Sequence, residues 1–150
     1  MILCILDTSV LCELLRVPGK HGAHEAAWAE FERRQAEGER FLLPVTVVLE
    51  TGNHIAQAND GQKRRACAER FVQLVTRSLD GDTPFTITPV PDPETVRGWL
   101  THFVHDATLG MGVGDRSLID LAEKQRAIHA HAKVRIWSLD RHLQGYDDAG

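Results

Sequence analysis

The chain has 150 residues and a formal net charge of −4, with 43% hydrophobic and 25% charged residues. This length fits a single domain, residues 1–150, that can bury a core without disulfide or metal cross-links. The negative charge argues against binding of polyanions through a generally basic surface. An enzyme that acts on nucleic acid is not excluded, because bound Mg²⁺ can reverse the local sign of an acidic cleft.

The sequence has no feature of a membrane or secreted protein. No apolar stretch approaches the roughly 20 residues needed to span a bilayer. The apolar residues 1–6 lack a basic leader, so they make a poor signal peptide. Cys4, Cys12 and Cys67 are odd in number and show no C-x-x-C spacing, which is typical of reduced, buried thiols. We therefore expect a cytoplasmic protein without a membrane segment.

The first part of the chain alternates between strand and helix patterns. Residues 2–6 are a continuous apolar run, the pattern of a strand buried on both faces of a parallel sheet. Residues 10–15 have helical spacing and stop before Pro18, and residues 24–38 predict an amphipathic helix. Residues 41–45 predict a second short strand.

The alternation continues to the end of the chain. Thr46 is expected to cap a helix, and a second helix is predicted over 62–78. Residues 85–90 predict a third strand, whose proline favours a sheet edge. A cap and proline at residues 92–93 predict a further helix start.

A glycine-rich segment, residues 110–114, then leads into a helix predicted over 115–130, and residues 134–139 predict a last strand. Strands that alternate with helices indicate βαβ units and a parallel sheet. The predicted class is therefore α/β.

Four acidic residues stand where a strand pattern ends or a helix begins: Asp7, Glu50, Asp115 and Asp140. In an open α/β sheet the carboxyl ends of the strands lie along one edge, where ligands usually bind. Carboxylates gathered there would repel one another unless a cation held them. The pattern therefore predicts a divalent-metal site. Each acid taken alone has a simpler explanation, as a helix cap or a charge near a helix N-terminus, but capping does not explain why all four fall at one edge.

Short motifs around these acids resemble those of the PIN-domain ribonucleases, and among them the VapC-type toxins of bacterial toxin–antitoxin pairs. Each motif is weak alone, but their order and spacing span residues 7–143. They read Leu6-Asp7-Thr8-Ser9, Leu43-Pro44 with Val48-Leu49-Glu50-Thr51, Gly114-Asp115-x-Ser117-Leu118-Ile119, and Trp137-Ser138-Leu139-Asp140-x-x-Leu143. One departure is Leu143, where many relatives have phenylalanine, and it affects packing more than chemistry.

The resemblance implies a PIN-like three-layer α/β/α sandwich with a mostly parallel central sheet. It also implies an endoribonuclease that uses Mg²⁺ or Mn²⁺ to cleave RNA, with Asp7, Glu50, Asp115 and Asp140 as the metal-site acids. Ser9, and with less support Thr8, would orient the first carboxylate through a hydroxyl hydrogen bond. The implied partners are RNA, a second copy of the chain in a homodimer, and a small antitoxin, for which residues 11–31 are the expected docking surface.

The chemistry of the acids agrees with this expectation. Mg²⁺ prefers carboxylate oxygens and water, and a bound metal can supply hydroxide at neutral pH and neutralise phosphoryl charge. Asp7 and Asp115 are the expected direct ligands, because one follows the first strand and the other starts a helix. Glu50 and Asp140 would complete the site by direct or water-mediated contact or by orienting the attacking water.

Other charged residues have weaker cases. Asp120 lies about 140° around a helix from Asp115, so a solvated position is expected. Arg116 either approaches a phosphate or pairs with a local acid, and the run 63–65 either meets RNA or is a solvated helix face. The pairs His21/His24 and His129/His131 lack further ligands at zinc spacing.

Two other functions fit parts of the sequence. A receiver-like module would bind Mg²⁺ at Asp7 for phosphoryl signalling, but it requires a lysine after a late strand, and Lys133 precedes that strand. A degenerate nuclease fold kept for protein binding would be expected to lose acids, whereas this chain has all four. Both remain alternatives to the nuclease.

Overall fold

An interior strand, β1 (Ile2–Leu6), organises the fold, which a computed structural model describes for residues 1–147. It pairs in parallel with β2 (Arg40–Leu43) on one side and with β4 (Lys133–Trp137) on the other. β3 (Phe85–Ile87) pairs in parallel with β2, so the strand order is β3-β2-β1-β4. The continuous apolar sequence of β1 is explained by its burial on both faces, since Cys4, Ile5 and Leu6 are all inaccessible to solvent.

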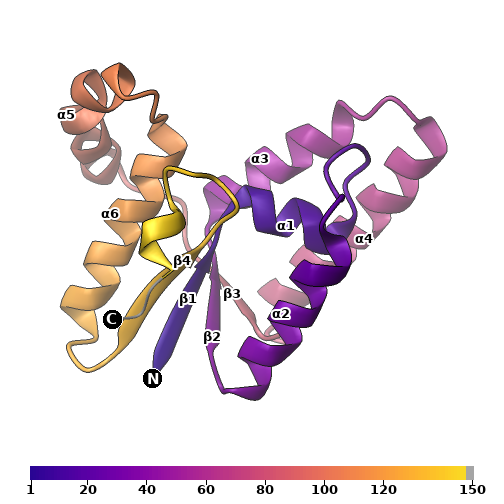
Figure 1. The fold of residues 1–150 in the computed structure, drawn as a ribbon, viewed down its shortest axis with the longest axis horizontal. Helices are drawn as coiled ribbons and strands as arrows, with labels where there is room; N and C mark the ends of the chain where they lie inside the picture. Colours follow the sequence, from indigo (N-terminus) through magenta and orange to yellow (C-terminus); the bar gives the residue numbers. More distant parts are fainter. Residues whose placement is uncertain (148–150) are drawn as a thin grey trace.

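Helices cover both faces of this sheet (Figure 1). The first two crossovers place four of them on one face, and the last crossover places α5 and α6 on the other. The helices are α1 (Thr8–Leu15), α2 (His24–Ala36), α3 (Val45–Ala56), α4 (Gly61–Leu79), α5 (Pro93–Thr108) and α6 (Val113–Ile128), and a short 3-10 turn, η1 (Gln144–Tyr146), follows β4. The predicted α/β/α sandwich with a parallel sheet is confirmed. Within residues 1–147, none of the helices combines the length and apolar character needed to cross a membrane.

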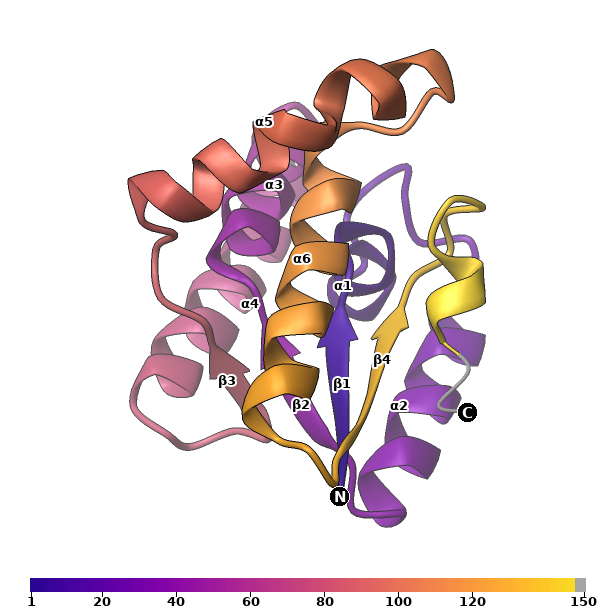
Figure 2. The same cartoon turned by 90° about the vertical axis from the view of Figure 1, so that its left-hand side faces the viewer.

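The strand order reverses direction at β1. From β1 the chain moves outward through β2 to β3, and then returns to the opposite side of β1 to form β4. The chain leaves β1 for α1 on one face of the sheet and enters β4 from α6 on the other face, and the carboxyl ends of β1 and β4 lie side by side at one edge, as Figure 2 shows from the α6 side. Crevices at such reversals are the usual ligand sites of open α/β sheets.

Two helix starts differ from the sequence prediction. α3 begins at Val45 with Pro44 as N-cap, so Thr46 lies inside the first turn and does not cap. Pro44 has an extended backbone and its carbonyl accepts from Val48 N at 3.1 Å, which closes the first turn without a side chain. α6 begins at Val113, so Asp115 lies in its first turn and is not the cap. The capping expected at Asp92 is present, because its carboxylate accepts from Thr95 N at 2.8 Å.

The core is built mainly from β1, its neighbouring strands and the helix faces that cover them. Three aromatic rings join α2 to the β2–β3 edge, with Phe31 stacked on Phe85 at 5.3 Å and tilted against Phe41 at 5.0 Å between ring centroids. Cys4, Cys12 and Cys67 are buried and unpaired, as the sequence predicted.

A buried ionic cluster ties the C-terminal segment to the sheet. The Arg34 guanidinium donates to both carboxylate oxygens of Asp147, at 2.8 and 2.7 Å, and lies 4.5 Å above the Trp137 ring. It also lies 3.9 Å from Glu39, whose side chain is fully buried and accepts from Arg135 at 2.9 Å. Burial raises the pKa of Glu39, and the two arginines oppose this shift.

We expect Arg34→Ala to lower the free energy of unfolding by about 3–5 kcal/mol, because it removes the bidentate partner of Asp147 and one of the two arginines beside the buried Glu39. Arg33→Ala is the matched control: Arg33 also pairs with Glu30 but is half exposed, and its loss should leave the stability near wild type. Urea unfolding of both variants measures the difference. Equal stabilities of the two variants would contradict the role of the cluster.

Candidate metal centre

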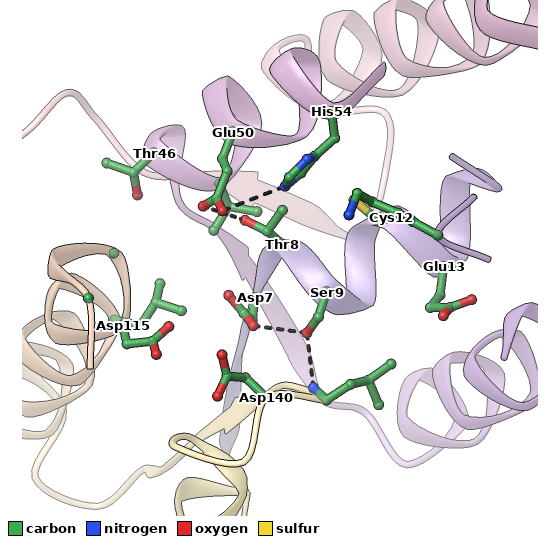
Figure 3. Close-up of a pocket in the computed structure, with 16 residues that line it drawn as sticks. Asp7, Thr8, Ser9, Cys12, Glu13, Thr46, Glu50, His54, Asp115 and Asp140 are labelled. Atoms are coloured by element: carbon green, nitrogen blue, oxygen red, sulfur yellow. Dashed lines mark hydrogen bonds and ion pairs between the residues drawn. The ribbon is translucent and has the colours of Figure 1, made fainter. Parts of the chain in front are cut away.

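A cavity of about 510 Å³ opens at the crevice between the carboxyl ends of β1 and β4. The four acids predicted from the sequence all line it, although they come from four separate segments (Figure 3). Asp7 follows β1, Glu50 lies on α3, Asp115 lies on α6 and Asp140 follows β4. The fold thus brings together residues up to 133 positions apart, the separation between residues 7 and 140.

The Asp7 carboxylate is the most firmly held of the four. Asp7 occupies the N-cap position of α1, but its side chain makes no capping hydrogen bond. Its Oδ2 atom instead accepts from Ser9 Oγ at 2.9 Å and from Ser138 Oγ at 2.6 Å. The bond from Ser9 is the one expected from the sequence. Both hydroxyls bind Oδ2, and the other carboxylate oxygen of Asp7, Oδ1, has no hydrogen-bond partner within residues 1–147.

Ser138 is a site residue that the sequence did not single out. Its hydroxyl accepts from Asp140 N at 2.9 Å and donates to Asp7, and Ser9 Oγ in the same way accepts from Leu139 N at 2.9 Å. Asp140 Oδ1 accepts from His142 N at 2.8 Å. This pattern locks the segment after β4 onto the start of α1. The only sequence signal was a hydroxyl residue two positions before a strand-end acid.

Glu50 is oriented from two sides. Thr8 Oγ1 donates to Glu50 Oε2 at 3.0 Å, and His54 Nε2 lies 3.7 Å from Glu50 Oε1. The expectation that Thr8 orients Asp7 is therefore wrong, because in the first turn of α1 its hydroxyl points toward α3 (Figure 3). Gly114 of α6 faces Glu50 across the cavity, and a Cβ atom there would lie 4.0 Å from Oε2.

Asp115 is affected by the other acids of the cavity. Its pKa rises from 3.8 to about 6, first because burial penalises the charged form and then through repulsion by Asp140, Asp7 and Glu50, while His142 acts in the opposite direction. Proximity to the N-terminus of α6 would favour the charge, but it does not offset these effects. The carboxylates therefore interact as one electrostatic group.

No lysine or arginine within residues 1–147 forms a salt bridge with any of the four acids, whose only such contact is His54 with Glu50. A buried acid outside the cavity does have an arginine partner. Asp106 of α5 is almost fully buried and forms a bidentate pair with Arg116, at 2.7 Å for both bonds. This pair decides between the two hypotheses for Arg116, which binds a local acid. The four cavity acids have no such arginine partner in residues 1–147.

The donor set suits a hard divalent cation. Carboxylate oxygens from Asp7, Asp115 and Asp140 face one space, with Glu50 at its margin (Figure 3). Within the described residues, no three His, Cys, Asp or Glu side chains lie close enough together to hold a metal ion by themselves. Mg²⁺ fits such an open arrangement, because it keeps several waters and binds through one or two carboxylates.

The remaining candidates from the sequence lie outside the cavity lining. Asp120 accepts from Trp99 Nε1 at 3.3 Å and pairs with Lys124 at 3.1 Å, so it serves the packing of α5 on α6. Arg64 donates to Ala58 O at 2.7 Å. His24 bonds to Glu13 O and Arg16, which gives it a structural role.

A scan against protein-family models and a search of curated proteins found no match. The function is therefore argued from the motifs and from the geometry of this site. A fold alone hosts many activities, whereas specific side chains restrict the chemistry.

We expect Asp115→Asn to raise the melting temperature of metal-free protein at pH 7.5. An aspartate whose pKa is higher in the folded protein than its ordinary 3.8 destabilises the fold at pH values above the shifted pKa. The difference in melting temperature between Asp115→Asn and wild type should shrink as pH falls through about 6. It should vanish near pH 4, where wild-type Asp115 is protonated in the folded state.

Asp120→Asn makes the same chemical change on the same helix but removes a favourable pairing with Lys124, so it should not stabilise the protein. Differential scanning calorimetry across this pH range compares the two variants. An Asp115→Asn protein that melts at or below the wild-type temperature at pH 7.5 would show that the carboxylates do not repel.

Proposed function

We propose that the protein is a Mg²⁺- or Mn²⁺-dependent endoribonuclease and the toxin of a toxin–antitoxin pair. The observation that carries the metal-dependent chemistry is the group of four carboxylates, without a lysine or arginine partner in residues 1–147, around one cavity at the sheet crevice. The choice of RNA, and of a toxin, comes from the resemblance of the four motifs to PIN-domain ribonucleases.

Asp7 and Asp115 would hold the metal directly, and Asp140 and Glu50 would complete the site. When bound, one or two such ions supply hydroxide at neutral pH and neutralise charge on the phosphoryl oxygens. Ser9 and Ser138 fix Asp7 so that Oδ1 is left for a ligand, and Thr8 and His54 fix the Glu50 carboxylate at the cavity margin. These partners reduce the reorganisation needed when the cation binds.

The non-catalytic alternative, a PIN-like or receiver-like module that binds protein, has less support. A module kept only for protein binding gains nothing from unpaired acids that repel one another in the folded state. The same acids are useful only if a cation binds among them.

We expect cleavage of mixed RNA to require Mg²⁺ or Mn²⁺ and to stop on addition of chelator. Asp7→Asn should reduce the rate by more than about 100-fold, and Ser138→Ala by about 10-fold, because losing a partner of a ligand costs about 10–100-fold. The asparagine oxygen can still accept from both serines, so the fold should survive. Asp120→Asn should cleave at the wild-type rate, since Asp120 lies outside the cavity lining.

Gel analysis of RNA fragments and thermal unfolding of metal-stripped protein provide the measurements. Millimolar Mg²⁺ or Mn²⁺ should raise the wild-type melting temperature by mass action and leave that of Asp7→Asn nearly unchanged. Wild-type cleavage by Asp7→Asn would refute the assignment, and an inactive wild type whose melting temperature ignores both metals would favour the non-catalytic module.

The toxin proposal adds partners to this activity. We expect a cytoplasmic homodimer that a small antitoxin silences by docking on residues 11–31. In this region Leu11 and Val17 are buried, but Trp28 is 45% exposed beside an apolar groove of about 350 Å³ between α2 and α4. An arginine of the antitoxin could bind the cavity acids bidentately and exclude metal, which favours arginine over lysine.

The toxin proposal predicts that expression of the protein alone arrests growth and that co-expression with a small neighbouring reading frame relieves the arrest. Trp28→Ala should weaken capture of that partner without changing RNA cleavage, because Trp28 lies outside the cavity lining. Colony counts and co-purification measure the two effects. Harmless expression of an active enzyme, with no partner recovered from the native host, would leave an RNA-processing nuclease.

A further inference from the structure

One cation lines the acidic cavity. Among the lining residues in the described part of the chain, Lys20 is the single lysine or arginine. It lies in the loop between α1 and α2, and no salt bridge within residues 1–147 involves it. Lys20 is exposed and has no salt-bridge partner in residues 1–147, so its ammonium is available to an anionic ligand in the same cavity.

The loop that carries Lys20 is held in place at both ends. Lys20 N donates to Val17 O at 2.8 Å, and Val17 N donates to Cys12 O at 2.9 Å. On the other side, the nearly buried Glu13 carboxylate accepts from Ala23 N at 3.0 Å. The Glu13 carboxylate is therefore bonded to the loop backbone, and these hydrogen bonds fix the backbone position of Lys20.

Lys20 lies at the α1 side of the cavity. Burial raises the pKa of the Cys12 thiol to about 11, and the charge of Lys20 opposes this shift while Glu50 and Asp7 add to it. The ammonium and both carboxylates therefore act on the same thiol. Figure 3 shows Cys12 on the side of the cavity opposite Asp115, with Asp7 and Glu50 between them. The acids and Lys20 thus mark two regions of one continuous cavity.

Nearby arginines are already engaged. Arg70 donates through Nε and Nη2 to Leu15 O, at 3.1 and 3.0 Å, at the end of α1. Arg16 donates to His24 Nε2 at 2.9 Å, and Arg116 is paired with Asp106. Lys20 is left as the cavity's own source of positive charge for a ligand.

A nucleic-acid chain brings several phosphates to a nuclease, and metal at the acids would neutralise the one being cleaved. The neighbouring phosphates would still meet a protein of net charge −4 and an acidic cavity wall. A cation placed along the bound nucleic-acid strand offsets this repulsion and fixes the register of the substrate in the cavity.

We propose that the Lys20 region of the cavity is a phosphate subsite, which binds the backbone phosphate of a nucleotide adjacent to the scissile bond. This inference rests on the proposed nuclease function and makes Lys20 a substrate-positioning residue. A lysine suits this task, since it acts as a flexible point charge that accepts any base sequence.

The first test compares Lys20→Ala with wild type on single-stranded RNA. KM should rise about three- to tenfold with kcat little changed, and the slope of log affinity against log salt should fall by about 0.7. Lys20→Arg should restore both values. Lys133→Ala, which removes the same charge at the start of β4 outside the cavity lining, should leave both values at wild type. The melting-temperature gain caused by Mg²⁺ should persist in Lys20→Ala, which separates a substrate effect from damage to the metal site.

The second test locates the phosphate. RNA substrates with one methylphosphonate linkage, which removes a single backbone charge, are scanned along the positions around the mapped cleavage site. One position next to the scissile bond should raise KM for wild type and have no further effect on Lys20→Ala.

The outcomes distinguish the two proposals. A wild-type KM and salt slope in Lys20→Ala, or additive effects of the substitution and every methylphosphonate, would overturn the subsite while the nuclease assignment stands. A wild-type protein that neither cleaves nor binds RNA in the presence of Mg²⁺ or Mn²⁺ would overturn both.

Discussion

Repulsion among four carboxylates that have no lysine or arginine partner in residues 1–147 is the constraint on which the site depends. Two buried acids elsewhere in the protein have arginine partners, Asp106 with Arg116 and Glu39 with Arg135. At the crevice between β1 and β4 the acids have no such partner, and burial followed by repulsion from the other carboxylates raises the pKa of Asp115. Leaving buried charge uncompensated costs stability, and proteins accept such costs mainly at functional sites. The contrast within one chain therefore separates acids that pair with arginine and hold the fold together from acids that have no lysine or arginine partner in residues 1–147.

The four acids differ in how rigidly the fold holds them. Asp7 and Asp140 follow adjacent parallel strands, and the Ser9 and Ser138 hydroxyls tie these two segments together. Glu50 and Asp115 instead project from helices on opposite faces of the sheet, so the width of the cavity follows the packing of those two layers. The side of the cavity formed by Asp7 and Asp140 is thus held by hydrogen bonds. The positions of Glu50 and Asp115 depend on how α3 and α6 pack. This arrangement suits a cation that keeps some of its waters and tolerates small changes in ligand position.

The placement of the site follows from sheet topology. In a sheet of order β3-β2-β1-β4, the chain leaves β1 for α1 on one face and reaches β4 from α6 on the other, so the carboxyl ends of these neighbouring strands lie at the point where the strand order reverses. The same opening gives access to the loop before α2, which brings Lys20 to the cavity although it belongs to none of the acidic motifs. The candidate metal site and the candidate phosphate site therefore share one cavity at this edge of the sheet.

The sequence by itself determined the features that depend on local pattern. Apolar runs predicted the strands, and Asp92 was recognised as a cap, because strand burial and capping involve neighbouring residues. The sequence also predicted that Asp7 and Asp140 would meet, since parallel strands end at one edge. Only the tertiary structure decided which hydroxyl serves which acid. Thr8 binds Glu50, 42 residues away, and Ser138 binds Asp7, 131 residues away. The tertiary structure also decided that Arg116 pairs with Asp106 and that Lys20 lines the cavity. Both contacts depend on how helices and loops pack. A sequence pattern does not record the direction of a single side chain.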